Sequence, residues 1–433
     1  MLQHGQVHMR TCWRLFYFVC ALLPTSLLQA QSPYRAAAAE IDITPPTGTW
    51  LAGYGRERAS TGTLDPLWAK VLVIQDDQTT LVLITLDNIG LTRPDVLRLQ
   101  QAVRAYLPDS QVIVSSTHTH AGPDVVGIWG ASWWRSGRNE SYMTATIERI
   151  ARLAQAIFDR RTVVSVHLAS AQQPLGWVQN LSEPQLLDQR LAVLHLIDET
   201  DQTVATLANY ACHPTVLGPE NTRVSADYVN GFYARMGEKY SGVHFFLQGA
   251  IGGWVQPIQG DRSPQLAREL GSSLAEATAT ILTTATLSDN LPIRFATATV
   301  DVPLANWGFR VLIWLGVLER TLYEGAMRTS VATFNIGQAQ FVTHPGETSP
   351  AYSLQTRRWL NSPHSFVLGL SQDAMGYILK PEYFAAEAVY PHGDYLTSVS
   401  VGPEAGPLIM QAIKGLLRAR ALPAEVPQRA HVE

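Results

Sequence analysis

Short apolar runs alternate along the chain with longer segments in which apolar residues recur every three to four positions. Apolar runs of this length are typical of buried strands, and a recurrence near 3.6 is typical of helices that pack one face on a core. The predicted strands are 71–74, 80–86, 112–116, 163–168, 192–197, 243–247, 295–302 and 341–343, and the predicted helices are 93–106, 141–158, 228–240, 264–283 and 403–418. This alternation predicts an α/β domain in which helices pack on mixed β-sheets.

The N-terminus has the pattern of a secretory signal. Two arginines precede an apolar run at 15–28, and the run ends in the small-residue boundary Gln29-Ala30. The run is shorter than the roughly 20 residues that span a bilayer, and Pro24 interrupts it, so a cleaved signal peptide over 1–30 is favoured over an uncleaved anchor. No linker or repeat divides the remainder of the chain, so we expect one large domain over 31–433 in a secreted or periplasmic protein.

Composition narrows the classes of protein further. With 46% hydrophobic and 16% charged residues, the chain has ample material for a core. The net charge of −4 lacks the basic excess that binds phosphate backbones, which argues against a nucleic-acid partner. Of the three cysteines only Cys212 lies beyond the predicted signal, and one thiol can support neither an internal disulfide framework nor a thiolate metal site.

Histidines follow two of the apolar runs. The strand at 112–116 continues into THTHAGPD, in which His118 and His120 point to one side if the strand extends, so that both imidazoles can approach one ion. The alternative is that they are polar residues in a tight loop closed by Gly122-Pro123. His213 follows another apolar stretch, TVATLANYA, and by itself is a weak signal.

A carboxylate follows a third apolar run. The stretch AQFVT ends in HPGE, where a Pro-Gly turn presents Glu347 just before a helix expected around 352–360. The alternative for Glu347 is an acid in the first helical turn, favoured by the helix dipole. Two or three imidazoles with one carboxylate are the ligands of a catalytic zinc ion with an open position for water. The G-x-S-x-G, H-E-x-x-H, Walker and G-x-G-x-x-G motifs are absent from the sequence.

Five segments in order resemble one family of enzymes. They are AAEIDITPPTGTWLAGYG, DPLWAKVLVI, VIVSSTHTHAGPD, NYACHPTVL and HPGE, and the resemblance as a whole spans about residues 38–407. This series resembles the neutral/alkaline, non-lysosomal ceramidases. The resemblance implies an α/β catalytic domain over 31–433 around one Zn²⁺ per chain, which hydrolyses the amide of an N-acylated, lipid-like substrate. It further implies at most peripheral contact with membranes, and it does not indicate an oligomeric state.

The resemblance also assigns roles to individual residues. It implies that His118, His213, Glu347 and Tyr377 hold the zinc ion, the last from the segment DAMGYILKPEYF, and it places Tyr377 among the catalytic residues as well. Without the resemblance, the pattern of residues around Tyr377 would not have distinguished it from the other tyrosines. The second histidine of the pair, His120, then resembles a substrate-side or proton-handling group, which differs from an arrangement in which both imidazoles of the pair bind the ion.

Two departures from the family bear on mechanism and substrate. The family's active-site loop resembles G-D-V-S-P-N with an essential serine, whereas this chain reads QGAIGGWVQP, with Val255 and Gln256 at the serine's place. We therefore expect zinc-activated water as the nucleophile, with amides of Gly252 and Gly253 near the developing oxyanion and Trp254 as a further substrate contact. The immunoglobulin-like C-terminal domain of the long ceramidases is not expected in this sequence.

Other residues carry weaker expectations. Asp87 and Asp227 are candidates for orienting ligand imidazoles, although Asp227 also suits a helix N-cap and Asp87 closes a strand. Trp129, Trp133 and Trp134 and an apolar stretch from Asn306 suit an acyl-chain groove, the alternative being ordinary packing.

Three functions remain open from the sequence. The favoured one is a zinc amidohydrolase of the ceramidase type that acts on a lipid-like substrate. The alternatives are a zinc esterase or amidase for a smaller polar substrate, and a metal-stabilised lipid-binding protein without turnover.

Overall fold

The computed structural model describes residues 34–258 and 260–421, and the predicted signal peptide lies outside these residues. The helices are α1 Arg93–Tyr106, α2 Glu140–Phe158, α3 Tyr228–Lys239, α4 Pro264–Leu282, α5 Trp307–Trp314, α6 Pro350–Leu360, α7 Gly393–Ser398 and α8 Ala405–Ala421, with a 3-10 turn at Pro381–Phe384. The strands are β1 Tyr34–Asp42, β2 Gly62–Thr63, β3 Trp68–Gln75, β4 Thr80–Leu86, β5 Ser110–Ser116, β6 Thr162–Gln172, β7 Val178–Asn180, β8 Arg190–Asp198, β9 Thr203–Tyr210, β10 Arg223–Val224, β11 Val243–Gln248, β12 Val255–Pro257, β13 Thr286–Leu287, β14 Phe295–Pro303, β15 Leu322–Tyr323, β16 Ala326–Ile336, β17 Ala339–Thr343, β18 Glu347–Thr348, β19 Ser365–Leu368 and β20 Tyr377–Ile378.

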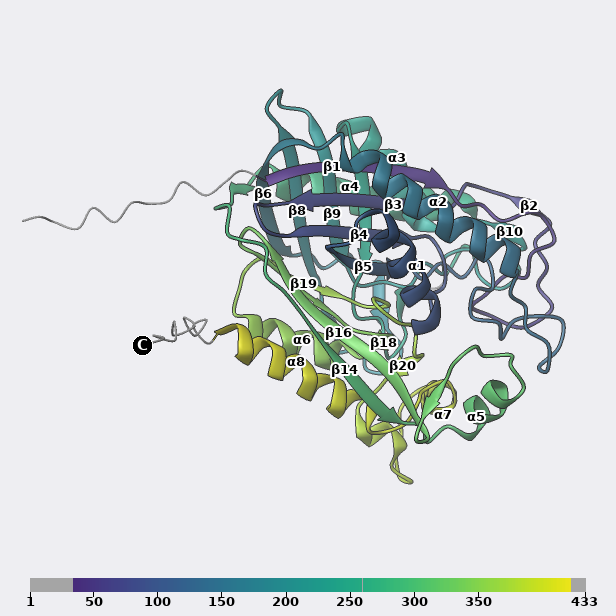
Figure 1. Cartoon of the computed structure of the whole chain (residues 1–433). Helices are drawn as coiled ribbons and strands as arrows, with labels where there is room; N and C mark the ends of the chain where they lie inside the picture. The colour runs from purple at the N-terminus through teal and green to yellow at the C-terminus, as the bar shows by residue number, and fades with distance from the viewer. Residues whose placement is uncertain (1–33, 259, 422–433) are drawn as a thin grey trace, which may run out of the picture. The chain divides into compact units, whose positions relative to one another are not determined.

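Two large sheets lie face to face between two layers of helices (Figure 1). The first sheet has the strand order β11-β9-β8-β6-β1-β3-β4-β5, with β13 beside β6. The second has the order β14-β16-β17-β19, with β15 beside β16. Helices α1 to α4 cover the outer face of the first sheet, and α6 and α8 cover the outer face of the second. The predicted α/β class with mixed sheets is confirmed.

The pattern of β3 shows why the first sheet is covered on both faces. Successive side chains of a strand point to opposite faces. Val71 and Val73 belong to the core under the helices, whereas Leu72 and Ile74 belong to the core between the two sheets. A strand buried on both sides reads as a continuous apolar run, which is why this strand was recognisable in the sequence.

Parallel pairs bring several strand ends to one place. Helix α1 connects the parallel strands β4 and β5 along the chain. In the same way α3 belongs to the connection from β9 to its parallel neighbour β11, and α6 to the connection from β17 to its parallel neighbour β19. Gln248, at the end of β11, donates from Nε2 to the carbonyls of Thr117, at 2.9 Å, and Cys212, at 2.8 Å. This one buried amide therefore joins the loops after β5 and β9, which carry His118 and His213.

The predicted helices agree closely with the structure, and α1 has the predicted bounds. The long strands β1 and β16 were not predicted, and the apolar stretch from Asn306 forms α5. Within the described residues no helix combines the length and apolar character needed to cross a bilayer.

Candidate metal centre

His118 stands in the loop after β5 in a strained backbone conformation. Its φ is 72°, a left-handed value that is uncommon for residues other than glycine. The ring is buried, and Nδ1 lies against the carbonyl oxygen of Ile89. Since a carbonyl only accepts hydrogen bonds, Nδ1 carries the hydrogen and Nε2 is left with its lone pair.

His213 is held in the same manner from the loop after β9. Its ring is fully buried, and Nδ1 donates to the carbonyl oxygen of Val255 at 2.7 Å. The backbone N–H of His213 donates to the same carbonyl at 2.9 Å. Burial lowers the pKa of His213, which favours the neutral ring. Val255 stands where the serine was expected, and its carbonyl fixes a histidine instead of supplying a hydroxyl.

Glu347, from β18, brings a carboxylate to both imidazoles. Its Oε2 lies 3.1 Å from Nε2 of His213 and 3.4 Å from Nε2 of His118. Three acceptor atoms thus face one another without a proton to share, an arrangement that a cation stabilises.

Tyr377 reaches this point from β20, which pairs with β18. The two strands are parallel, and Tyr377 is the register partner of Glu347. Burial and the neighbouring Glu347 carboxylate raise the pKa of the Tyr377 hydroxyl. The structure therefore brings together all four residues that the ceramidase resemblance named, although they lie far apart in the sequence.

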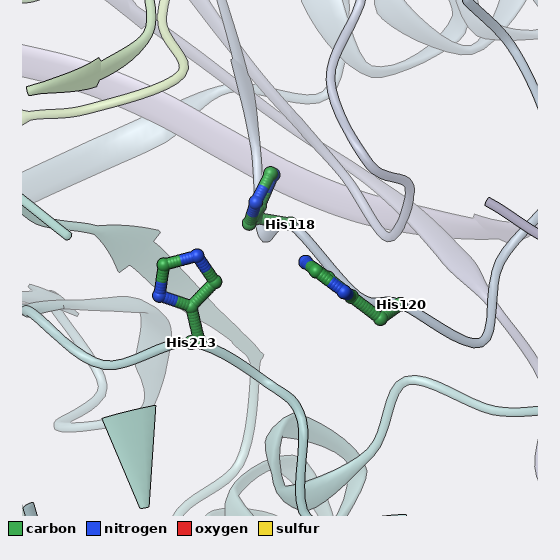
Figure 2. A group of neighbouring side chains, drawn as sticks. All are labelled: His118, His120 and His213. Atoms are coloured by element: carbon green, nitrogen blue, oxygen red, sulfur yellow. The ribbon is translucent and has the colours of Figure 1, made fainter. Parts of the chain in front are cut away.

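His120 faces the cluster from the side (Figure 2). Its ring centroid lies 4.9 Å from that of His118 and 5.6 Å from that of His213. The ring is buried, and neither nitrogen has a hydrogen-bond partner among the described residues. Burial, together with the other two imidazoles, lowers the pKa of His120 well below its ordinary value. A neutral imidazole with two unused nitrogens is suited to binding a metal or to exchanging a proton with substrate.

Two donor sets can hold a metal ion here. One atom from each of His118, His120 and His213 lies within 4.8 Å of the others, so three buried histidines can bind one ion. The other set replaces His120 by Glu347, with Tyr377 adjacent. Both sets share His118 and His213, and both are compatible with zinc.

Comparison with known proteins addresses the fold. No family model and no curated protein matches the sequence. The structure of a neutral ceramidase from Pseudomonas aeruginosa matches with a TM-score of 0.71, over 91% of this chain and 76% of that one, at 19% identity. A structure described as ceramidase complexed with C2 matches with a TM-score of 0.72 over the same shares of the two chains, at 17% identity. The chain has the neutral ceramidase fold.

Within this neutral ceramidase fold, the two candidate orienting carboxylates serve other purposes. Asp227 caps α3 and accepts from the backbone N–H groups of Val216, Leu217 and Tyr228. Asp87 accepts from the N–H of Trp68 and from the hydroxyl of Tyr233. Burial raises the pKa of each aspartate to about 6. Backbone carbonyls, not carboxylates, orient the two imidazoles, so this expectation was wrong.

The glycines predicted to bind substrate lie behind the cluster. The N–H of Gly252 donates to the carbonyl of Thr348 at 2.8 Å, and a Cβ at this position would meet the backbone of Glu347 at 2.6 Å. Its amide is therefore engaged in packing the loop against β18, and the predicted oxyanion contact is wrong. Gly253 has a φ of 81° and faces Asn180. Neither glycine is among the described residues that line the cavities beside the cluster.

Two cavities meet at His120. One, of about 90 Å³, is largely apolar and reaches His118, Glu347 and Tyr377. The other is a larger cleft of about 880 Å³ lined by both polar and apolar residues, among them Trp254, whose contact with substrate stays a prediction. His120, Gly53 and Tyr395 line both, so a ligand that occupied both cavities would pass beside the His120 imidazole.

Sequence reasoning missed several residues around this junction. Gly53 packs so closely that a Cβ there would lie 2.3 Å from the His120 ring, and Tyr54 contacts the ring edge-on at 4.9 Å. Tyr395 stacks on Trp254 with a centroid distance of 5.1 Å. Gln256 lines the larger cleft, and its buried Nε2 has no partner among the described residues. The GYG segment at 53–55, the end of the first of the five segments that resemble the ceramidases, was the one available signal.

His344, beside the centre, allows a test of how burial acts on stability. Burial and the guanidinium of Arg357 lower its pKa from 6.5 to about 3. A lowered histidine pKa contributes stability that is complete above pH 6.5 and is lost as the pH falls toward 3. Between pH 7 and pH 4 the free energy of unfolding of the wild type should fall by about 3 kcal/mol more than that of His344→Gln. Denaturant unfolding at both pH values measures this difference, and equal losses in the two proteins would contradict it.

Proposed function

We propose that the chain is a zinc-dependent amidohydrolase that cleaves the amide of an N-acylated, lipid-like substrate. The observation that carries the proposal is the convergence of two carbonyl-oriented imidazoles and one carboxylate on a point without a proton to share. The ceramidase fold supports the same class of reaction. His118, His213 and Glu347 would hold the ion, with Tyr377 beside them.

The chain's own groups fit this ion and prepare the site for it. The carbonyls of Ile89 and Val255 fix both rings with their Nε2 lone pairs inward, so the donor atoms need no reorganisation. When bound, zinc polarises a carbonyl and makes water a stronger acid near neutral pH. Burial of the cluster excludes bulk water and strengthens each electrostatic interaction within it.

His120 would carry the proton that the leaving amine requires. It is neutral, its two nitrogens are free of other described groups, and it stands between the two cavities. An amide substrate with its acyl part in the apolar cavity and its polar part in the cleft would place its nitrogen beside this ring. Gln256 would then position the polar part through its unused side-chain amide.

A panel of fluorogenic N-acyl substrates tests this function. Purified protein should hydrolyse amides with apolar acyl groups, lose the activity with a chelator, and regain it with zinc. Preference for an ester or a small polar amide would favour the alternative enzyme, for which the supporting observation is that Gln179, Asp261 and Arg262 are among the residues that line the larger cleft. Metal binding with no hydrolysis of any substrate would favour the non-catalytic alternative.

Hydrolysis is expected to proceed without an acyl-enzyme. Residues 252–257 contain no serine or threonine, and Val255 uses its carbonyl to hold His213. Water is then the nucleophile, and product should form without an initial burst. Rapid-quench kinetics and intact-mass measurement during turnover check this. Detection of a protein carrying the acyl group would show that an unassigned side chain attacks the substrate.

Export of the protein is part of the proposal and rests on the sequence of residues 1–30. A secreted or periplasmic location would place the enzyme on the side of the membrane where lipid-like substrates from outside the cell are met.

A further inference from the structure

Trp254 and Tyr395 form an aromatic surface on the wall of the larger cleft. The two rings stack with an interplanar angle of 21°, and His392 contacts the indole edge-on at 4.9 Å. Tyr395 is 46% exposed, so part of this surface is open to the cleft. We call Trp254 and Tyr395 the aromatic platform. Other tryptophans are exposed at the surface and line neither cavity, namely Trp133, Trp134, Trp307 and Trp314.

Two glutamine side chains line the same cleft. Gln179 of β7 and Gln256 of β12 are register partners in an antiparallel pair of strands. Gln256 is only 7% exposed, and its Nε2 has no hydrogen-bond partner in the part of the chain that the structure describes. Gln179 donates to the carbonyl of Pro257 at 3.5 Å, the limit of a hydrogen bond. A buried amide without a partner costs free energy, so a ligand whose oxygen accepts from Gln256 is favoured.

Strand β12 connects these groups with the metal centre. Trp254 and Gln256 flank Val255, whose carbonyl accepts from Nδ1 of His213 at 2.7 Å. His120 lines the cleft together with the aromatic platform. A ligand on the platform therefore shares one cleft with the imidazole that faces the metal centre.

The charges of the cleft wall argue against an ionic ligand. Arg262 already pairs with Glu220 at 2.6 Å, so its guanidinium is not free for an anionic group. The carboxylate of Asp261 accepts from the hydroxyl of Ser263. A cation would need ring faces that surround it, whereas the two rings of the platform stack on each other with centroids 5.1 Å apart and leave no room between them. An uncharged polar ligand fits these groups best.

We propose that the larger cleft binds a hexopyranose ring. Such a ring presents C–H groups on its face and hydroxyls around its edge. The C–H groups match the negative face of an aromatic ring, and hydroxyls that both donate and accept match the amides of Gln179 and Gln256. In the reaction this sugar would be the headgroup of the N-acylated amide, a step that rests on the proposed function. Binding of the sugar itself does not require turnover.

Calorimetric titration with methyl β-glucopyranoside and methyl β-galactopyranoside tests the binding. The wild type should bind at least one of them, and should not bind cyclohexane-1,2-diol, which lacks most of the hydroxyls. Trp254→Ala should weaken binding at least about tenfold. Gln256→Met should weaken it about threefold to tenfold and should melt no lower than the wild type, because the amide it removes has no partner in the free protein. Gln78→Met is the matched control at an exposed turn and should bind as the wild type does.

The titration has two outcomes that would overturn the proposal. One is a wild type that binds neither glycoside, and the other is equal binding by the wild type, Trp254→Ala and Gln256→Met. Tetramethylammonium is titrated in parallel. If it binds and the glycosides do not, the platform recognises a cation and the proposal is wrong.

Turnover separates this proposal from the proposed function. An N-acyl amide with a hexose headgroup should have a kcat/KM at least about tenfold above that of the same amide without the sugar, and Gln256→Met should reduce this ratio. Glycoside binding without hydrolysis of either amide would support the sugar site and contradict the amidohydrolase. Hydrolysis of both amides at equal rates, without glycoside binding, would support the amidohydrolase and overturn the sugar site.

Discussion

Replacing Glu347 by alanine should abolish stoichiometric metal binding and lower kcat/KM by at least about a thousandfold. The carboxylate is the one anionic group that contacts both His118 and His213, at 3.4 Å and 3.1 Å, among the residues that the structure describes. Without it, two neutral imidazoles would have to bind a divalent cation in a buried site with no compensating charge. His213→Ala should have the same effect, because it removes a donor that the fold has already oriented.

Elemental analysis and kinetics on the same preparations check this prediction. Wild-type protein should contain about one zinc per chain, and both variants should contain almost none. His344→Gln is the control, because His344 is a buried histidine three positions from Glu347 and bonds Thr356 rather than the cluster. It should keep its metal and its activity at neutral pH. Full metal occupancy in Glu347→Ala and His213→Ala would refute the assigned ligands.

Replacing His120 by asparagine should leave the metal in place and lower kcat by about a hundredfold to ten-thousandfold. The ring faces the cluster and both cavities, and its nitrogens are not committed to other described residues. If it transfers a proton to the leaving amine, substrates with better leaving groups should lose less activity than poor ones. The pH dependence of kcat should also change shape.

Metal content decides between the two donor sets. If His120→Asn loses the zinc and Glu347→Ala retains it, the three histidines hold the ion and Glu347 is the proton-handling group. If His120→Asn retains zinc and normal kcat for every substrate, His120 has no part in catalysis. Melting temperatures of both variants in the presence of chelator show whether the fold itself is intact.

The apolar pattern predicted most of the fold because local and tertiary preferences agree in those segments. In the helix at 93–106 and in strands such as β3, the apolar residues that the sequence pattern places on the core side are the residues that are buried. The strands that were not predicted are those in which the local preference of the residues differs from the structure that tertiary packing imposes. Strand β1 contains four consecutive alanines, which favour helix, and β16 buries Thr329 and Thr333 between apolar positions.

In the candidate site, too, some residues could be recognised from the sequence pattern and others could not. Histidines at strand ends and a carboxylate after a Pro-Gly turn were visible because loops at the ends of buried strands are where functional groups gather. Tyr377 came only from the family resemblance, since nothing local distinguishes it from the other tyrosines. Its place beside Glu347 is a consequence of the pairing of β18 with β20.

By itself, the sequence determined the class of fold and the strand ends that carry His118, His213 and Glu347. Only the tertiary structure decided which groups face one another. Carbonyls rather than Asp87 and Asp227 orient the imidazoles, the amide of Gly252 is used in packing, and the tryptophans divide between cleft and surface. The physical reason is that hydrogen-bond partners and burial depend on contacts between segments far apart in the chain, to which a local pattern of residues is insensitive.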